Sequence, residues 1–347
     1  AIMRQYENAL CIAGTHGKTT TTSMTTHIFM AAHADPTVMI GGTLPMLHSG
    51  YRVGKGETII LESCEYCNSF LHFFPTVAVV LNVEEDHLDF FKNLDDIKAS
   101  FRKFAQLVPP EGRVVANADN PGTMDALRGL PLFTFGCAPE ADCRAENLTW
   151  NRGRPDFDVV VGGDLYAHLS LRVAGMHNVY NALAAAAAAY TLGISGKAVR
   201  QGLEGFFGAG RRFEFKGQFN GAKIYDDYAH HPAELHALLD MARTLGYERV
   251  ICAFQPHTYT RTKALFDDFV RELKAADLVV LTDIYAAREK NTIGVSSKEL
   301  ADQIPGSLYC PSLGEAADCL RELAQTGDLI ITVGAGDIYT VGEALVG

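Results

Sequence analysis

The sequence predicts an α/β protein with two domains, each built on a mostly parallel β-sheet. Short apolar runs typical of buried strands alternate with segments of helical periodicity along most of the chain. This alternation is typical of parallel sheets that carry helices on both faces. It is interrupted by a glycine-rich stretch at residues 205–211, which we interpret as a linker. We therefore expect one domain at residues 1–207 and a smaller one at residues 208–347.

Four strands are predicted in the first half of the chain, at residues 8–13, 58–61, 77–81 and 113–116, with helices at residues 19–32 and 95–107 between them. The first strand ends at Gly14, and the other three are followed by Glu62, Asn82 and Asn117. Open parallel sheets bind ligands at the carboxyl ends of their strands. We therefore expect a ligand site at this edge.

The remaining elements follow the same reasoning. A strand-rich stretch at residues 142–173 precedes an alanine-rich helix at residues 178–190, which we expect to be tightly packed. Strands are expected at residues 222–225, 249–254, 277–282 and 328–333. A helix with proline in its first turn is expected at residues 232–245. Two capping boxes predict further helix starts, at Ser296 with Glu299 and at Ser312 with Glu315.

Composition excludes several classes of protein. The net charge of −11 argues against a surface that binds nucleic acid or anionic lipid. No apolar run is long enough to predict a membrane span. Eight scattered cysteines without a signal peptide indicate reduced thiols, so we expect a cytoplasmic protein. Separately, we expect a monomer or weak dimer. Because a buried strand begins within ten residues of the start, we also expect a domain-sized segment upstream.

The clearest motif follows the first predicted strand and opens a helix, with the sequence Gly-Thr-His-Gly-Lys-Thr-Thr-Thr-Thr at residues 14–22. Glycines let the backbone approach phosphate, and the helix N-terminus adds partial positive charge. Lys18 is expected to reach the β- and γ-phosphates of a nucleotide, and Thr19 to offer its hydroxyl to Mg²⁺. Ile12 stands where the usual motif has its first glycine, which disfavours motors and kinases. The expected nucleotide-binding residues are Gly14, Thr15, His16, Gly17, Lys18, Thr19 and Thr20.

This loop resembles the nucleotide loop of the Mur ligases, above all that of the alanine-adding member, and the resemblance extends over almost the whole chain. The family has domains for a UDP-sugar, for ATP and for the incoming amino acid. This chain resembles the second and third. The resemblance implies a central P-loop-type parallel-sheet ATPase domain followed by a smaller Rossmann-like α/β domain. The segment expected upstream would be the UDP-binding domain.

A metal site is expected beside the phosphate loop. Glu62 suits Mg²⁺ because carboxylates at the edge of the sheet face the phosphates, and Glu65 is a weaker candidate. Cys64 and Cys67 replace two aspartates of the family pattern, and we interpret them as ordinary thiols. The segment Asn-Val-Glu-Glu-Asp-His-Leu-Asp at residues 82–89 resembles a family motif that implies His87 as ligand of a second Mg²⁺, with Asn82 arranging the site. An alternative is a helix start with acids in its first turn. The predicted metal ligands are Thr19, Glu62 and His87.

Two segments resemble further nucleotide contacts. The sequence Gly-Met-His-Asn-Val-Tyr-Asn at residues 175–181 implies Asn178 at the adenine, with His177 and Asn181 nearby. These residues could equally be an ordinary helix start. The segment Gly-Arg-Arg-Phe at residues 210–213 resembles the domain junction, where Arg212 would reach the phosphates after closure. A solvated linker arginine is the alternative.

The last group of candidates lies in the second predicted domain. The segment at residues 225–232 implies that Asp227 contacts the nucleotide, with His230 less certain. The segment at residues 254–261 contains His257 and Arg261, and Thr258 replaces an arginine of the family pattern. Arg288 stands where many relatives have glycine. His257, Arg261 and Arg288 could instead be solvated loop side chains. His230 could be only a local hydrogen-bonding group. The predicted substrate residues are Asn82, His230, His257, Arg261 and Arg288.

Together, the resemblance implies ATP-dependent ligation of L-alanine to the carboxylate of UDP-N-acetylmuramate, through an acyl phosphate, in peptidoglycan precursor synthesis. ATP and Mg²⁺ would be required, and the implied catalytic residues are Lys18, Glu62, His87 and Arg212. Two alternatives remain open. One is a sibling ligase that attaches murein peptide to the same sugar. The other is an ATP-binding module without ligase activity.

Overall fold

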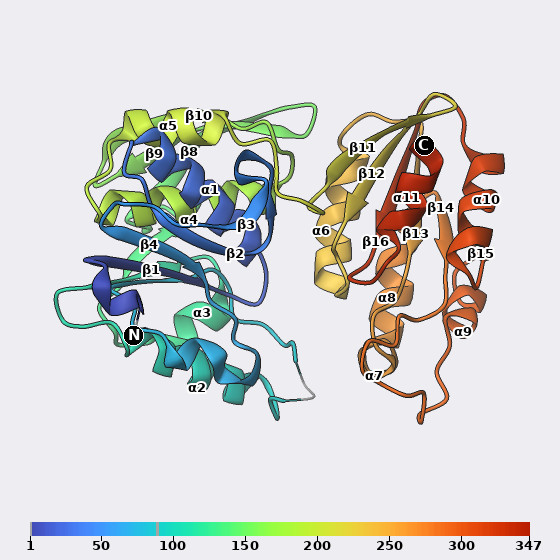
Figure 1. Ribbon diagram of the computed structural model, residues 1–347, viewed down its shortest axis with the longest axis horizontal. Coiled ribbons are helices and arrows are strands. Elements are labelled where there is room, and N and C mark those ends of the chain that lie inside the picture. Colours follow the sequence, from blue (N-terminus) through green and yellow to red (C-terminus); the bar gives the residue numbers. More distant parts are fainter. Residues whose placement is uncertain (1, 88–89) are drawn as a thin grey trace. The chain divides into compact units, whose positions relative to one another are not determined.

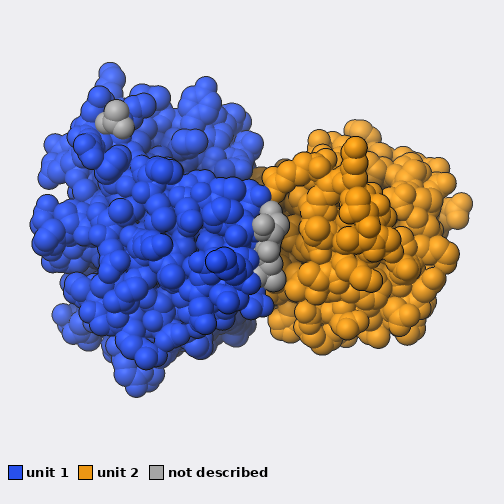
Figure 2. All heavy atoms as spheres, turned by 90° about the horizontal axis from the view of Figure 1, so that it is seen from below, with its two compact units in different colours: residues 1–209 blue, residues 210–347 orange. Residues whose placement is uncertain are grey.

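The computed structural model describes residues 2–87 and 90–347. The chain divides into two compact units, unit 1 ending at Ala209 and unit 2 spanning Gly210–Gly347 (Figure 2). The boundary predicted after residue 207 lies close to this division. Leu88 and Asp89, the last residues of the predicted metal motif, lie outside the described residues.

The described part of unit 1 forms a ten-stranded sheet in the order β10-β9-β8-β7-β6-β5-β1-β4-β2-β3 (Figure 1). Its centre is parallel: β1 pairs with β4 and β5, and parallel pairing continues to β8. The hairpin of β2 and β3 and the meander of β8, β9 and β10 are antiparallel. The strands are β1 Asn8–Ala13, β2 Thr37–Leu44, β3 Ser49–Arg52, β4 Thr58–Glu62, β5 Val77–Val80, β6 Arg113–Asn117, β7 Phe133–Gly136, β8 Cys143–Asn151, β9 Arg154–Val161 and β10 Asp164–Ser170.

Helices cover both faces of this sheet, as predicted. Along β1, Leu10 and Ile12 belong to one buried cluster with α1, α4 and α5, whereas Ala9 and Cys11 belong to another with α2 and α3. Alternate side chains of a strand point to opposite faces, so the central strands are buried on both sides. The helices are α1 Lys18–Ala31, α2 Leu94–Ala105, α3 Pro121–Ala126, α4 Met176–Thr191 and α5 Gly196–Glu204, with short 3₁₀ helices η1 Ile2–Gln5, η2 Pro45–Leu47 and η3 Tyr66–His72.

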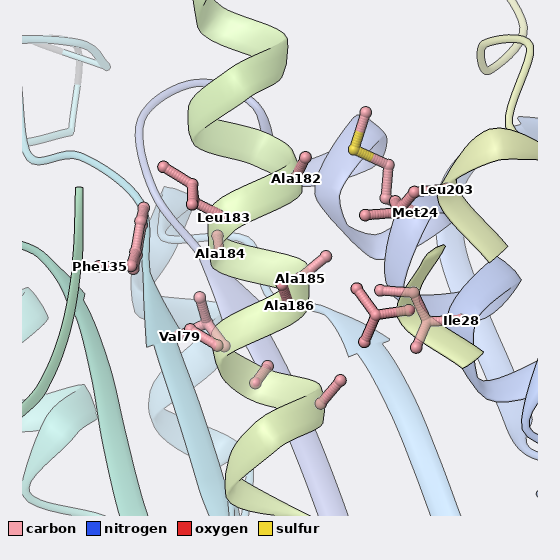
Figure 3. Close-up of a cluster of buried hydrophobic side chains, with 14 of the residues drawn as sticks. Met24, Ile28, Val79, Phe135, Ala182, Leu183, Ala184, Ala185, Ala186 and Leu203 are labelled. Carbon is pink, nitrogen blue, oxygen red and sulfur yellow. The ribbon is translucent and has the colours of Figure 1, made fainter. Parts of the chain in front are cut away.

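The alanine-rich helix α4 is the tightly packed element that the sequence predicts. Its residues 182–189 are all fully buried. Figure 3 shows Leu183 turned toward Phe135, while Ala182 and Ala185 face Met24 and Ile28 of α1. Small side chains on every face let neighbouring elements approach α4 closely from several directions. This packing fixes α4 against α1, the helix that follows the phosphate loop.

Unit 2 has a six-stranded sheet in the order β11-β12-β16-β13-β14-β15. All pairings are parallel except that of β11 with β12. The capping boxes predicted at Ser296 and Ser312 are confirmed, and His231 forms a third with Glu234 that the sequence did not suggest. The strands are β11 Glu214–Phe219, β12 Ala222–Asp227, β13 Arg249–Phe254, β14 Leu278–Leu281, β15 Leu308–Tyr309 and β16 Asp328–Val333. The helices are α6 Pro232–Arg243, α7 Tyr259–Ala264, α8 Phe266–Leu273, α9 Ser297–Asp302, α10 Leu313–Leu323 and α11 Tyr339–Val346.

The predicted α/β class is therefore confirmed for both units. In unit 1 the sequence did not reveal β2, β3 and β7. Gly41 and Gly42 interrupt the apolar pattern of β2, and interior glycine weakens a strand signal. The structure also explains Gly41: a Cβ atom there would lie 2.6 Å from the carboxylate of Glu62.

Candidate active site

The phosphate loop runs from the end of β1 to the start of α1. Gly17 caps the helix with φ of +83°, a conformation that side chains disfavour. Its N-cap position makes no side-chain hydrogen bond, so the first N–H groups of α1 are not capped by a side chain. Such a helix start suits an anion. The loop thus has the geometry that its sequence predicts.

Asn82 and Thr15 hold this loop against the segment that follows β5. The Asn82 Oδ1 atom accepts a 2.7 Å hydrogen bond from the His16 N–H, and its amide nitrogen donates to the His16 carbonyl. The Glu84 N–H donates to the Thr15 hydroxyl at 2.9 Å, and the Thr15 N–H donates to the Asn82 carbonyl. Asn82 was predicted to arrange the site, and its contacts are with the loop backbone.

Lys18 is anchored within the loop. Its Nζ atom donates to the carbonyls of Gly14 at 2.6 Å and Thr15 at 3.1 Å, and to Oε1 of Glu65 at 3.0 Å. Burial favours the neutral amine, but the charge and hydrogen bond of Glu65, together with the electrostatic effects of Cys64 and Glu62, outweigh it, so the pKa of Lys18 is raised. The Lys18 side chain, which is 15% exposed, is therefore a charged ammonium.

The predicted metal ligands lie in two places: Thr19 and Glu62 contact each other, and His87 contacts Glu65. The Thr19 hydroxyl donates to Oε1 of Glu62 at 3.0 Å, and Oε2 of Glu62 accepts from the Gly41 N–H at 2.7 Å. His87 lies beside Glu65, with 3.7 Å from Nε2 to Oε1, and its ring packs on Tyr66 at 4.7 Å between centroids. Hydroxyl and carboxylate oxygens are the ligands that Mg²⁺ prefers, so Thr19 and Glu62 fit this ion.

Within residues 2–87 and 90–347, no group of three or more histidine, cysteine or acidic side chains is arranged to hold a metal. Cys64 and Cys67 are exposed free thiols.

Glu65, which the sequence made a weaker candidate than Glu62, lies between two of the other candidates in the structure. It is 2% exposed and contacts both Lys18 and His87, two of the predicted catalytic residues. The available signal was its position three residues after Glu62, at the carboxyl end of β4. The departures at Cys64 and Cys67 obscured that signal.

The predicted adenine residues lie at the start of α4, and their amides bond within the protein. Asn178 donates to the Ala174 carbonyl at 2.7 Å, and Asn181 donates to Asn178 at 3.2 Å. Asn181 also accepts from the hydroxyl of Thr21 at 3.1 Å. His177 lies against the Asn178 amide at 3.1 Å. Asn181 therefore connects α4 to the beginning of α1, which positions the phosphate loop.

In unit 2, Arg211 and Arg212 have different environments. Arg211 donates to Asp226 at 2.9 Å and to the carbonyls of Gly334 and Gly336, so it ties the start of the unit to the end of β16. Arg212 lies over the ring of Tyr228 at 5.3 Å. Asp227 accepts from the N–H groups of Phe213 and Ala229. Burial raises the pKa of Asp227 to about 6, against the opposing effects of Arg212 and these N–H groups.

Four of the predicted substrate residues, those other than Asn82, lie together at the ends of β12, β13 and β14. The rings of His230 and His257 are 5.9 Å apart, and Arg261 lies 3.3 Å from Nδ1 of His257. Burial, followed by the charges of His230 and Arg261, lowers the pKa of His257 to about 4, and Arg288 adds to this effect. Thr258 has φ of +67°, a strained conformation of the kind found at functional sites. Arg261 and Arg288 supply positive charge to this cluster, which suits a carboxylate or phosphate.

The fold and the phosphate loop define a nucleotide-binding α/β protein with a second α/β unit. Residues 12–189 match the model of the Mur ligase middle domain, and residues 211–336 match that of the Mur ligase, glutamate ligase domain. This chain belongs to the Mur ligase family, which confirms the predicted resemblance.

Named relatives are similar over nearly the whole chain. UDP-N-acetylmuramate--L-alanine ligase of Caldanaerobacter subterraneus is 47% identical over 99% of this chain and 76% of the relative. The enzyme of the same name from Clostridium novyi is 45% identical with the same coverage. The crystal structure of UDP-N-acetylmuramate-alanine ligase MurC from Thermotoga maritima superposes with a TM-score of 0.84 at 28% identity, covering 99% of this chain and 76% of that one. A murein peptide ligase from Psychrobacter arcticus, 24% identical, shares the fold with a TM-score of 0.71, covering 99% of this chain and 77% of that one.

Across the described residues, no helix combines the length and apolar character that a membrane crossing requires.

Proposed function

We propose that this chain joins L-alanine to the carboxylate of UDP-N-acetylmuramate at the expense of ATP, through an acyl-phosphate intermediate. The observation that carries the proposal is the similarity to alanine ligases over nearly the whole chain, with the phosphate loop and the Thr19–Glu62 pair in place. We further propose that it acts in the cytoplasm, in peptidoglycan precursor synthesis, without nucleic-acid or membrane partners and as a monomer or weak dimer.

The chemistry requires activation of an unreactive carboxylate. One carboxylate oxygen of the sugar attacks the γ-phosphorus of ATP, the bond to the bridging oxygen breaks, and ADP leaves. The alanine amine then attacks the acyl carbon and loses a proton, and phosphate departs as the amide forms. Water would destroy the acyl phosphate, so the site must exclude it.

Within unit 1, Lys18 would stabilise the negative charge on the phosphates, and the N-terminus of α1 would add its dipole. Thr19 and Glu62 would hold Mg²⁺, with His87 proposed for a second ion. When bound, Mg²⁺ would supply positive charge to the phosphate oxygens. His16, Asn178 and Asn181 would contact the nucleotide, and Asn82 would keep the loop in shape.

In unit 2, we assign Arg212 and Asp227 to the nucleotide and the cluster of His230, His257, Arg261 and Arg288 to the substrates. The guanidinium groups of Arg261 and Arg288 match the α-carboxylate of an amino acid. Because the pKa of His257 is about 4, its ring is neutral near pH 7 and adds no charge of its own.

The experiment mixes the chain with ATP, Mg²⁺, L-alanine and UDP-N-acetylmuramate, and follows phosphate release and the product mass. It is run with and without the UDP-binding domain of a relative, because the family resemblance implies a requirement for that domain. Product in either reaction supports the proposal. Murein tripeptide in place of L-alanine tests the sibling ligase. ATP binding without product from any substrate would instead support the non-catalytic module.

A further inference from the structure

Every proton of the Lys18 ammonium already has an acceptor inside the protein. Two of the three acceptors are the loop carbonyls of Gly14 and Thr15, and the third is the carboxylate of Glu65 at 3.0 Å. An ammonium group has three donors and no more. Lys18 must therefore give up at least one of these acceptors before it can bind a phosphate oxygen.

Of the three acceptors, the Glu65 carboxylate attracts the Lys18 ammonium most strongly because it is an anion and the other two are neutral carbonyls. Its side chain is 3% exposed, and that of Lys18 is 15% exposed, so water screens this pair poorly. If a nucleotide attracted Lys18 away, Glu65 would remain as a buried carboxylate without its main counter-charge. A buried charge that loses its partner is strongly unfavourable.

The charge of Glu65 can be compensated by a cation that binds near it. The Thr19–Glu62 pair lies at the same end of the phosphate loop, one residue from Lys18. His87 Nε2 lies 3.7 Å from the Glu65 carboxylate. A divalent cation bound near Thr19 and Glu62 would restore the positive charge that Glu65 loses when Lys18 turns to a phosphate.

We propose that Glu65 is a positioning residue that makes nucleotide binding depend on a divalent cation: it holds Lys18 until nucleotide and metal arrive together. This inference rests on the proposed function, which assigns the nucleotide to this loop. It predicts that metal-free nucleotide binds weakly because it must leave Glu65 uncompensated, and that the penalty disappears when Glu65 carries no charge.

The neighbouring acids Glu62 and Glu84 have other hydrogen-bond partners than Lys18. Glu62 bonds to Thr19 and to the Gly41 N–H. Glu84 lies on the adjoining loop, its side chain is 42% exposed, and its carboxylate contacts Asn120 and His16. Glu84 therefore provides a matched control, an acid beside the same loop that does not hold Lys18.

The test measures ADP affinity by isothermal titration calorimetry, once with Mg²⁺ and once with EDTA, for the wild type, Glu65→Gln, Glu65→Asp and Glu84→Gln. The glutamine variant keeps the shape and loses the charge, whereas the aspartate variant keeps the charge. The quantity compared is the ADP affinity with Mg²⁺ divided by the ADP affinity with EDTA. We expect this ratio to fall about tenfold or more in Glu65→Gln, chiefly because metal-free ADP binds more tightly. Glu65→Asp and Glu84→Gln should keep a ratio within about threefold of the wild type.

An unchanged ratio in Glu65→Gln, with tight binding of ADP and Mg²⁺ together, would overturn this inference and leave the proposed function intact. An equal fall of the ratio in Glu65→Asp would also overturn it, because shape rather than charge would then be responsible. If the wild type bound ADP under neither condition, the nucleotide assignment itself would be wrong.

Discussion

The amide oxygen of Asn181 on α4 lies 2.6 Å from the place that a Cβ atom on Gly17 would occupy. Gly17 also has φ of +83°, so two independent constraints require glycine at the N-cap of α1. The same amide oxygen accepts a hydrogen bond from Thr21 one turn into that helix. The phosphate loop is thus shaped by a residue far away in the sequence.

Gly17→Ala should therefore weaken ADP binding by about tenfold or more, because the added methyl displaces either the loop or Asn181. Gly129→Ala is the matched control: its φ is +80°, but nothing lies within 4 Å of the added atom. It should cost only about 1 kcal/mol of stability and leave ADP affinity unchanged. Calorimetric titration and thermal unfolding of both variants separate the backbone strain that they share from the steric clash with Asn181 that only Gly17→Ala has. Equal ADP affinities would show that Asn181 does not shape the loop.

A histidine in unit 1 should make that unit sensitive to mild acid. Burial lowers the pKa of His27 to about 4, and its ring packs edge-on against Phe206. In the unfolded chain the His27 imidazole binds a proton near pH 6.5, and in the folded protein only near pH 4. The stability that neutral His27 contributes is therefore complete above pH 6.5 and is lost as the pH falls toward 4. We expect His27→Gln to lose roughly 1 kcal/mol less stability than the wild type between pH 7 and pH 5.

The readout is urea unfolding followed by the fluorescence of Trp150, the single tryptophan of the sequence, which lies on β8 in unit 1. His236→Gln, an exposed substitution in unit 2, should leave this pH dependence as it is in the wild type. A pH dependence in His27→Gln as steep as that of the wild type would show that another group is responsible.

The ion pair of Arg249 with the buried carboxylate of Asp328 should be essential for the stability of unit 2. Two hydrogen bonds, of 2.8 and 2.6 Å, join the guanidinium to a carboxylate that is 2% exposed. Arg249→Met leaves this carboxylate without its partner and should destabilise unit 2 by about 3 kcal/mol, measured by differential scanning calorimetry. Arg271→Met breaks an exposed pair on α8 and should cost less than about 1 kcal/mol. Similar losses in both variants would contradict the importance of burial.

The cationic cluster in unit 2 leads to a kinetic prediction. If Arg261 and Arg288 bind the α-carboxylate, lysine at either position loses the planar, two-pronged contact. Arg261→Lys and Arg288→Lys should raise the KM for L-alanine about tenfold or more and leave the KM for ATP nearly unchanged. Arg243→Lys, at the exposed end of α6, serves as the control. A rise in the KM for ATP alone would show that these arginines bind the nucleotide and not L-alanine.

The sequence identified candidate site residues from two signals. Glu62 and Asn82 were identified because strand ends of a parallel sheet share one edge. Lys18 was identified from the phosphate-loop motif. Glu65 was underestimated because it lies in η3, where Cys67 and Asn68 have positive φ and no periodicity describes the path of the chain. Arg212 was chosen over Arg211 through the family resemblance alone, since two identical neighbours differ only in which partners the fold offers them.

Helix α4 has a consequence for how this sequence can diverge. Its alanines from 184 to 189 are all fully buried, with neighbours packed around the helix. A single-nucleotide change in an alanine codon leads to Gly, Ser, Thr, Pro, Val, Asp or Glu, and most of these add volume or charge where there is no room. We expect this helix to be among the slowest parts of the gene to drift, although none of these six alanines takes part in the chemistry.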